Sequence, residues 1–327
     1  DRVNSTKAVI VCGGPGTLSN MYPGKYPLAT NLDDIKVPMV IMGSGWYGTP
    51  GDEATLTQYR FSASTKQLFE RIHRQGHMIG VRDYLTQRVL RKDGVDGVIM
   101  TGCPSWYDLA YLDHDFEAPD AIRTVAFTPP AKPLFTQQAS EVMRMLRQLF
   151  PDARLICSFH RGLAQDEHTT EKEARPLEEM ALAARVLGFE VVDSSYGLEN
   201  VGFYDECDLH VGYRVHGHIF FLSQRKPSFL IHEDGRGRGV SEAISLPGVQ
   251  GWERTPLGIV AAKLGQPRLS AHLERRGWEI VASPSAVTQL EGYIREELES
   301  GFARFSGLAQ TFRQYYSSMV HFLATIP

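Results

Sequence analysis

The chain has 327 residues, of which 43% are hydrophobic and 22% charged, and its formal net charge is −4. These values are typical of a folded globular protein of about two domains and exclude a disordered or fibrous chain. No long run of basic residues is present, so nucleic acid is not an expected partner. The sequence also shows neither a signal peptide nor an apolar run of about 18 residues, which predicts a cytoplasmic protein.

Short apolar runs rich in β-branched residues alternate along the chain with longer amphipathic stretches. This pattern is typical of parallel strands joined by helices. Strands are predicted at residues 7–14, 37–45, 77–83, 96–104, 123–130, 153–160, 189–195, 208–213, 227–234 and 278–284. Helices are predicted at residues 137–150, 171–188 and 217–224. We therefore expect an α/β protein with two Rossmann-like parallel-sheet domains that face a cleft.

The acidic, proline-containing stretch 112–123 is the candidate linker between the two domains. The predicted first domain then covers residues 1–118, and the second covers 119–285. Residues 286–327 are mostly helical, and aromatic residues recur there at spacings near three, four and seven. Because such a face needs a surface to cover, we expect a C-terminal helix over about 286–323 that packs back on the first domain. The alternative is a stripe that faces a membrane.

Arg214 and His216 stand between an apolar strand and the short helix that follows it. A buried charge without a partner costs several kcal/mol, so Arg214 needs a carboxylate or a ligand. A strand-to-helix turn with arginine, histidine and backbone N–H groups predicts an anion site. The structural alternative is an ion pair with a carboxylate such as Asp208, beside a core histidine. A metal site at His216 and His218 has less support, because no third ligand is in view.

Several segments resemble the polysaccharide pyruvyltransferase family. In residues 208–242, DLHVGYRVHGHIFFLSQRKPSFLIHEDGRGRGVSE, an aspartate-led strand runs into an R-x-H-G turn, a small helix, a proline-led strand and an acidic residue followed by a basic one. Residues 77–107, HMIGVRDYLTQRVLRKDGVDGVIMTGCPSWY, resemble the first domain of that family. The runs AVIVCGGPGTL and VPMVIMGSGW resemble its glycine-ended strands, so the resemblance spans most of residues 8–245.

The resemblance implies a fold of glycosyltransferase B (GT-B) type and an enzyme that transfers pyruvate from phosphoenolpyruvate to a sugar as a cyclic ketal. The implied acceptor is a cell-envelope exopolysaccharide or its lipid-linked precursor, which suits a cytoplasmic enzyme with peripheral contact to the inner face of the membrane. Phosphoenolpyruvate is the donor substrate, and no cofactor or metal is implied. Two alternatives are a nucleotide-sugar-dependent glycosyltransferase of the same fold and a non-catalytic glycan-binding relative.

The implied reaction suggests roles for three catalytic candidates. Arg214 and His216 are expected to stabilise the departing phosphate, and His216 is also a candidate proton donor. Asp234 matches the acidic residue of the family pattern and is the candidate base or orienter for the sugar hydroxyl. Its structural alternative is an aspartate that caps a glycine turn.

The remaining candidates are substrate contacts. Arg236 matches the basic residue of the family pattern, and Arg161 follows the strand at 153–160 beside His160. The other candidates are glycines that permit close backbone approach, namely Gly13, Gly14, Gly16 and Gly217. Arg82 and Asp83 are predicted to form a structural pair or a helix cap instead.

Two features depart from the family pattern. The N-x-G-D strand and helix expected before Ala8 are not in this sequence, so the first sheet is expected either to lack that strand or to receive it from a preceding segment. In the first strand of the second domain, only Lys132 stands where some relatives have arginine. One anion contact is therefore left unassigned.

Overall fold

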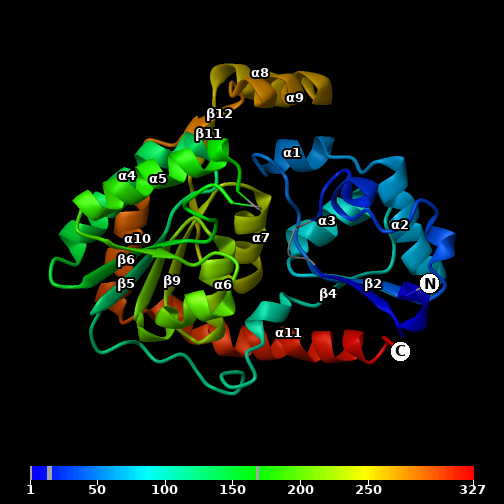
Figure 1. Cartoon of the computed structure of the whole chain (residues 1–327), viewed down its shortest axis with the longest axis horizontal. Coiled ribbons are helices and arrows are strands. Elements are labelled where there is room, and N and C mark those ends of the chain that lie inside the picture. The colour runs from blue at the N-terminus through cyan, green and yellow to red at the C-terminus, as the bar shows by residue number, and fades with distance from the viewer. Residues whose placement is uncertain (1, 13–16, 167–168) are drawn as a thin grey trace.

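The computed structural model describes residues 2–12, 17–166 and 169–327, and within them two parallel sheets lie side by side (Figure 1). The first sheet has the strand order β1-β2-β3-β4. Its strands are β1 (Val9–Cys12), β2 (Met39–Ser44), β3 (Ile79–Val81) and β4 (Val98–Met100). The helices of this domain are α1 (Glu53–Gln58), α2 (Ala63–Arg74) and α3 (Tyr84–Lys92), with short helical turns at Val3–Ser5, Met21–Lys25, Leu32–Asp34 and Pro104–Trp106.

The second sheet has six strands among the described residues, in the order β10-β9-β8-β5-β6-β7. They are β5 (Thr124–Thr128), β6 (Arg154–Phe159), β7 (Glu190–Asp193), β8 (Leu209–Gly212), β9 (Ser228–His232) and β10 (Val249–Gln250). Strands β8 and β9 are buried along their whole length, as their continuous apolar sequences predict. The strand order reverses between β5 and β8, which pair directly.

Helices cover the second sheet and connect its strands. They are α4 (Thr136–Leu149), α5 (Glu171–Val186), α6 (Val215–Ser223), α7 (Gly235–Ile244) and α10 (Ala286–Ser300), with short helical turns at Pro133–Phe135 and Leu198–Glu206. Helix α6 is apolar on most sides and lies against β8, β9 and the Pro104–Trp106 turn. The predicted α/β class with two parallel sheets is confirmed.

The C-terminal region contains two helices where the sequence predicted one. Helix α10 ends at Gly301 and Phe302, which both adopt positive φ angles of 64° and 59°, and a turn at Ala303–Gly307 follows. Helix α11 (Leu308–Leu323) then runs along the first domain, where Met319 and Phe322 pack with Val40 (Figure 1). Phe302, Phe305, Phe312 and Tyr315 are buried, so this region packs on protein as predicted, and the alternative of a membrane-facing stripe here is not supported.

A projection between β10 and α10 was not predicted. Strands β11 (Trp252–Arg254) and β12 (Ile280–Ala282) pair antiparallel and carry α8 (Pro256–Leu264) and α9 (Pro267–Arg276) above the rest of the molecule (Figure 1). We call residues 256–278 the head. The strand predicted at 278–284 thus belongs to this two-stranded sheet and not to the parallel sheet.

The two domains meet through helix α7, which lies against α3. Gly235 and Gly239 are one turn apart, so they share a face of α7. A Cβ atom at Gly235 would come within 2.7 Å of the Trp46 ring, and one at Gly239 within 2.6 Å of the Asp83 carboxyl group. Glycine at these positions lets the helix lie close enough for Gly235 N–H to donate to the Gly48 carbonyl at 2.9 Å.

Candidate active site

The candidate site lies where the carboxyl ends of the two sheets meet. Ligands of open parallel sheets bind beyond the carboxyl ends of strands, at the point where the strand order reverses. Arg214 follows β8 at this point, and Arg82 follows β3 of the first sheet. Both line a pocket of about 40 Å³, together with His216, Asp234 and Arg236. We call Arg82, Arg214, His216 and Arg236 the cation pocket.

The start of helix α6 holds the Arg214 turn in place. Arg214 is the N-cap residue, and its backbone N–H donates to Thr128 Oγ1 at the end of β5, at 3.3 Å. Gly217 is buried, and a Cβ atom there would lie 3.0 Å from His210 Nε2 and 3.2 Å from Thr128 Cγ2. The structure therefore gives Gly217, a predicted substrate contact, a packing role that lets α6 begin directly beneath the pocket.

Arg82 and Arg214 both have buried nitrogen atoms without a hydrogen-bond partner among the described residues. Arg82 is 2% exposed, and its Nε and one terminal nitrogen are unbonded. Its Nε lies 3.8 Å from Asp83, too far for a hydrogen bond. The Nε of Arg214 is likewise unbonded. Because buried guanidinium nitrogens without hydrogen bonds are costly, these atoms favour a site that binds an anion.

The structural alternative for Arg214 is not observed. The Asp208 carboxylate accepts hydrogen bonds from the backbone N–H groups of Arg123 and Thr124, both at 2.8 Å. It ties β8 to β5 at the opposite end of these strands. Asp208 therefore does not serve as the partner of Arg214.

Asp234 and Arg236 form a bidentate ion pair at the start of α7. Asp234 Oδ1 accepts from the backbone N–H and Nε of Arg236, both at 3.0 Å, and Oδ2 lies 2.8 Å from a terminal nitrogen. Burial opposes ionisation, but the Arg236 guanidinium holds the pKa of Asp234 below its ordinary value. The Arg236 guanidinium also lies 4.3 Å from the centre of the Tyr47 ring in the first domain. Asp234 thus orients Arg236 and caps α7.

Glu233 is a site residue that sequence reasoning missed, although it stands next to Asp234 at the end of β9. Its Oε1 accepts from the backbone N–H groups of Ala131 and Lys132, both at 3.1 Å. Burial raises the pKa of Glu233, while the charge of Arg214 acts in the opposite direction. Glu233 is therefore a buried carboxyl group beside the cation pocket that can hold a proton.

His216 is exposed to the cleft from the first turn of α6. Partial loss of hydration in the pocket, together with the charges of Arg82, Arg236 and Arg214, lowers the pKa of His216 to about 4. The imidazole is therefore neutral near neutral pH. A neutral ring has one acceptor and one donor nitrogen, so it can accept a proton from a hydroxyl group.

His218 lies outside the site, and its side chain is buried in the second domain. Its Nδ1 lies 2.7 Å from Ser228 Oγ, which is also 2.7 Å from His210 Nδ1. Among the described residues, no group of three or more His, Cys, Asp or Glu side chains could hold a metal ion. The metal alternative for His216 and His218 is therefore not supported.

A larger cleft of about 510 Å³ adjoins the cation pocket and shares Arg214 with it. Its walls come from the Pro129–Pro133 segment after β5 and from Pro176, Leu177 and Met180 of α5. Arg161, predicted as a substrate contact, also lines this cleft. His160 lies beside it, and its Nε2 is 2.7 Å from Tyr204 Oη.

Comparison with known families decides the identity. The profile described as "Polysaccharide pyruvyl transferase" matches residues 1–234. The chain belongs to the polysaccharide pyruvyl transferase family. The match ends at Asp234, so it includes Arg82, Arg214, His216 and Glu233 and excludes Arg236.

Solved structures identify the fold of this family member. MnaA of S. aureus, solved with UDP, has a TM-score of 0.53 at 13% identity, over 98% of this chain and 74% of that one. UDP-GlcNAc 2-epimerase from Neisseria meningitidis, bound to UDP-GlcNAc, has a TM-score of 0.49 at 10% identity, over 97% and 76%. S. aureus TarM, solved with Fondaparinux, alpha-GlcNAc-glycerol and UDP, has a TM-score of 0.47 at 11% identity, over 90% and 51%. Comparison with curated proteins gives no match. The predicted GT-B fold is confirmed.

Among the predicted residues of this pyruvyl transferase family member, the structure brings Arg214, His216, Asp234 and Arg236 together. Gly13, Gly14 and Gly16 lie outside the described residues. Arg82 and Asp83 form the predicted ion pair at 3.8 Å, and Asp83 caps α3 as predicted. Arg82 also supplies a cation from the first domain to the pocket. The side-chain Nζ of Lys132 makes long contacts of 3.4 Å to Thr49 Oγ1 and to the Glu233 carbonyl. Arg82 is therefore the candidate for the anion contact that the sequence left unassigned.

Proposed function

We propose that this protein transfers pyruvate from phosphoenolpyruvate to two hydroxyl groups of a sugar, forming a cyclic ketal and releasing phosphate. The observation that carries the proposal is the pair of buried, incompletely bonded guanidinium groups, Arg82 and Arg214, which face one pocket from two domains. Phosphoenolpyruvate carries a phosphate and a carboxylate, which arginine binds well. Membership of the pyruvyl transferase family supports the same donor.

The reaction places clear demands on the site. One sugar hydroxyl attacks C2 of the enolpyruvate and loses its proton, while the methylene carbon takes up a proton and becomes a methyl group. A second hydroxyl then forms the other C–O bond at C2 as the bond to the phosphate oxygen breaks. The second proton leaves with the phosphate, so atoms and charges balance.

Individual residues suit these demands. Arg82, Arg214 and Arg236 bind the donor anion and stabilise the departing phosphate. The raised pKa of Glu233 suits a proton donor to the methylene carbon. Neutral His216 suits a base for the attacking hydroxyl, and Asp234 orients Arg236. The cleft beside Arg214 and Arg161 is the space for the sugar acceptor, a glycan of the cell envelope or its lipid-linked precursor.

Ligand-induced thermal stabilisation tests the donor. Phosphoenolpyruvate at about 100 times its dissociation constant should stabilise the protein by about 2.7 kcal/mol, while UDP- and GDP-sugars should not. The variant Arg82→Gln should lose this stabilisation, and Arg74→Gln, which changes an exposed arginine of the same domain, should keep it. Mass spectrometry of an acceptor screen should then detect added pyruvate. Stabilisation by a nucleotide sugar and not by phosphoenolpyruvate would instead support the glycosyltransferase alternative.

A further inference from the structure

The head presents apolar side chains to solvent on its outer side. Leu257, Val260 and Leu264 are each more than half exposed, and they recur in α8 at i, i+3 and i+7. This spacing places them on one face of the helix. Trp278, directly after α9, is also 52% exposed. The region is thus an apolar patch on a projection and not a set of scattered surface residues.

The inner side of the head is firmly held, so this exposure does not result from loose packing. Thr255 caps α8 by accepting from the Gly258 N–H at 3.0 Å, and a Cβ atom at Gly258 would lie 2.1 Å from the Glu279 carbonyl. Ala261 and Leu273 are buried between the helices and their support. The patch is therefore presented outward by a defined structure.

Basic residues flank the apolar patch. The head contains Lys263, Arg268, Arg275 and Arg276 against one acidic residue, a net charge of +3 in a chain of net charge −4. Arg268, Arg275 and Arg276 of α9 are exposed. The acidic residue, Glu274, lines a pocket together with Thr55 and Gln58 of α1 in the first domain. The guanidinium of Arg276 lies 5.7 Å from the centre of the Trp278 ring.

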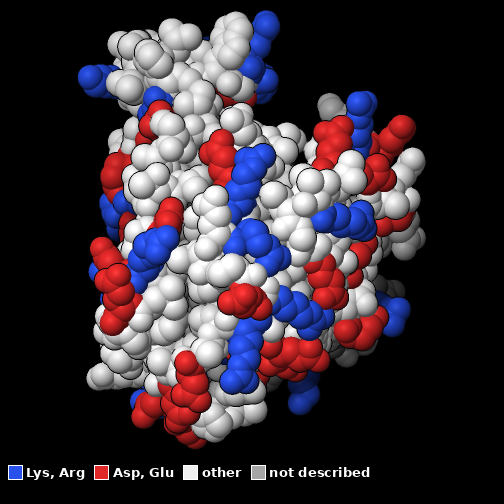
Figure 2. Space-filling view, turned by 90° about the vertical axis from the view of Figure 1, so that its left-hand side faces the viewer, with Lys and Arg blue, Asp and Glu red and all other residues white. Residues whose placement is uncertain are grey.

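We propose that the head docks the protein onto an anionic lipid surface. Exposed aliphatic side chains, an exposed tryptophan and nearby basic residues are features that favour the lipid–water interface. Figure 2 shows the head as a mainly uncharged projection with Lys and Arg atoms at its edges. No helix among the described residues is long and apolar enough to span a bilayer, so the contact is peripheral.

The size of the patch favours a membrane over a second protein. A stable protein interface buries roughly 800 Å² on each partner. One face of the nine-residue helix α8, about 14 Å long, supplies much less. Insertion of a few side chains into a lipid interface needs no such area, because the attraction between basic residues and an anionic surface adds to the apolar contact.

Vesicle co-sedimentation of the full chain tests the proposal. The protein should bind vesicles that contain phosphatidylglycerol, bind pure phosphatidylcholine vesicles weakly, and lose binding as salt is raised. Leu257→Ser with Val260→Ser should lower binding about tenfold or more, since lipid contact scales with buried apolar area. Lys263→Gln with Arg275→Gln and Arg276→Gln should lower binding to anionic vesicles alone.

The matched control is Leu182→Ser with Val186→Ser in α5, where both side chains are even more exposed. This variant should bind vesicles like the unchanged protein. Absent vesicle binding, or equal losses in control and head variants, would overturn the proposal. A dimer by light scattering that the apolar head variant abolishes would assign the patch to self-association instead. The charge variant changes only exposed side chains, so it remains a valid test if the serine variant fails to fold.

Discussion

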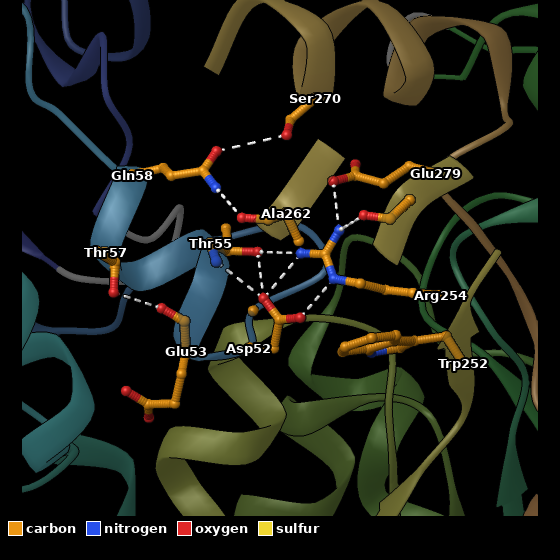
Figure 3. A network of polar contacts seen from close by, with 12 residues as sticks. Asp52, Glu53, Thr55, Thr57, Gln58, Trp252, Arg254, Ala262, Ser270 and Glu279 are labelled. Atoms are coloured by element: carbon orange, nitrogen blue, oxygen red, sulfur yellow. Dashed lines mark hydrogen bonds and ion pairs between the residues drawn. The ribbon is translucent and has the colours of Figure 1, made fainter. Parts of the chain in front are cut away.

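The contact between the two domains contains arginines in two different states. At the base of the head, Arg254 is fully bonded: it pairs with Asp52 at 2.6 and 2.9 Å and with Glu279 at 2.9 Å (Figure 3). In the cation pocket, Arg82 and Arg214 keep unbonded buried nitrogens. From this difference we infer that Arg254 stabilises the fold and that Arg82 and Arg214 bind an anionic ligand.

We call Arg254 and its partners Asp52 and Glu279 the clasp. Local structure already orients one of these carboxylates. Asp52 caps helix α1 by accepting from the Thr55 N–H at 2.8 Å, and this leaves its outer edge free for the arginine. Gln58 of α1 adds a bond to the Ala262 carbonyl at 3.1 Å (Figure 3). Within the clasp two carboxylates surround one arginine, whereas cations outnumber carboxylates among the residues that line the pocket. We infer that the clasp holds the domains together while the pocket binds the donor.

The sharpest test of the pocket is Arg214→Lys, which keeps the charge but removes the planar fork. We expect kcat to fall by a factor that corresponds to about 2 to 4 kcal/mol, comparable to the loss of one oxyanion donor. The melting temperature should change little. Phosphate release with phosphoenolpyruvate and an accepted sugar measures kcat, and calorimetry measures the melting temperature.

Arg144→Lys, at an exposed position of α4, is the control for Arg214→Lys. His216→Ala should also lower turnover strongly. Near-normal turnover in both Arg214→Lys and His216→Ala would show that the active site lies elsewhere.

A change in the clasp should lower stability and leave donor binding nearly unchanged. Arg254→Met leaves the carboxylates of Asp52 and Glu279 without their partner, so we expect a loss of about 2 to 3 kcal/mol in the free energy of unfolding. Donor binding should change far less. Chemical denaturation measures the effect, and Arg175→Met, which breaks an exposed pair with Glu179 on α5, should cost about 0.5 kcal/mol or less. A stable Arg254→Met variant that cannot bind the donor would reverse the two assignments.

Asp234→Asn distinguishes an orienting residue from a base. If Asp234 orients Arg236, the variant should raise the KM for phosphoenolpyruvate about tenfold, since one charge-assisted contact is weakened by about 1.4 kcal/mol, and kcat should change little. A collapse of kcat with unchanged KM would show that Asp234 is the base. Steady-state kinetics with each substrate varied separates the two outcomes.

The buried histidines of the second domain predict how stability depends on pH. Burial lowers the pKa of His218 to about 3 and that of His160 to about 3, below the ordinary value of 6.5. Between these values the unfolded chain binds more protons than the folded one. Stability is therefore fully present above about pH 6.5 and is lost as the pH falls, by at most about 1.4 kcal/mol per pH unit for each histidine.

His218→Asn should flatten this dependence, even though the loss of the contact with Ser228 lowers stability near neutral pH. His321→Asn, at an exposed position of α11, should leave the dependence unchanged. Denaturation midpoints between about pH 7 and pH 4.5 measure both variants. An unchanged dependence in His218→Asn would mean that His218 does not stay neutral in the fold.

The sequence alone predicted nine of the ten strands described in the two parallel sheets, all except β10, and the anion turn at Arg214 and His216. Strand and helix periodicity is a local property, and buried parallel strands produce apolar runs that stand out in any sequence. The R-x-H-G turn was visible because it places charge between two such runs. Its family resemblance was also carried by contiguous residues.

Only the tertiary structure decided which polar groups meet. Arg82 and Asp83 do form a local ion pair, but the contact of α7 with α3 also brings Arg82 to the pocket of Arg214, which is more than 130 residues away in sequence. Two residues after His216, helical rotation turns His218 into the core, where its Nδ1 lies 2.7 Å from Ser228 Oγ. The head was missed because its apolar side chains face solvent. No local pattern encodes these outcomes, since each depends on which surfaces the packed sheets bring together or leave open.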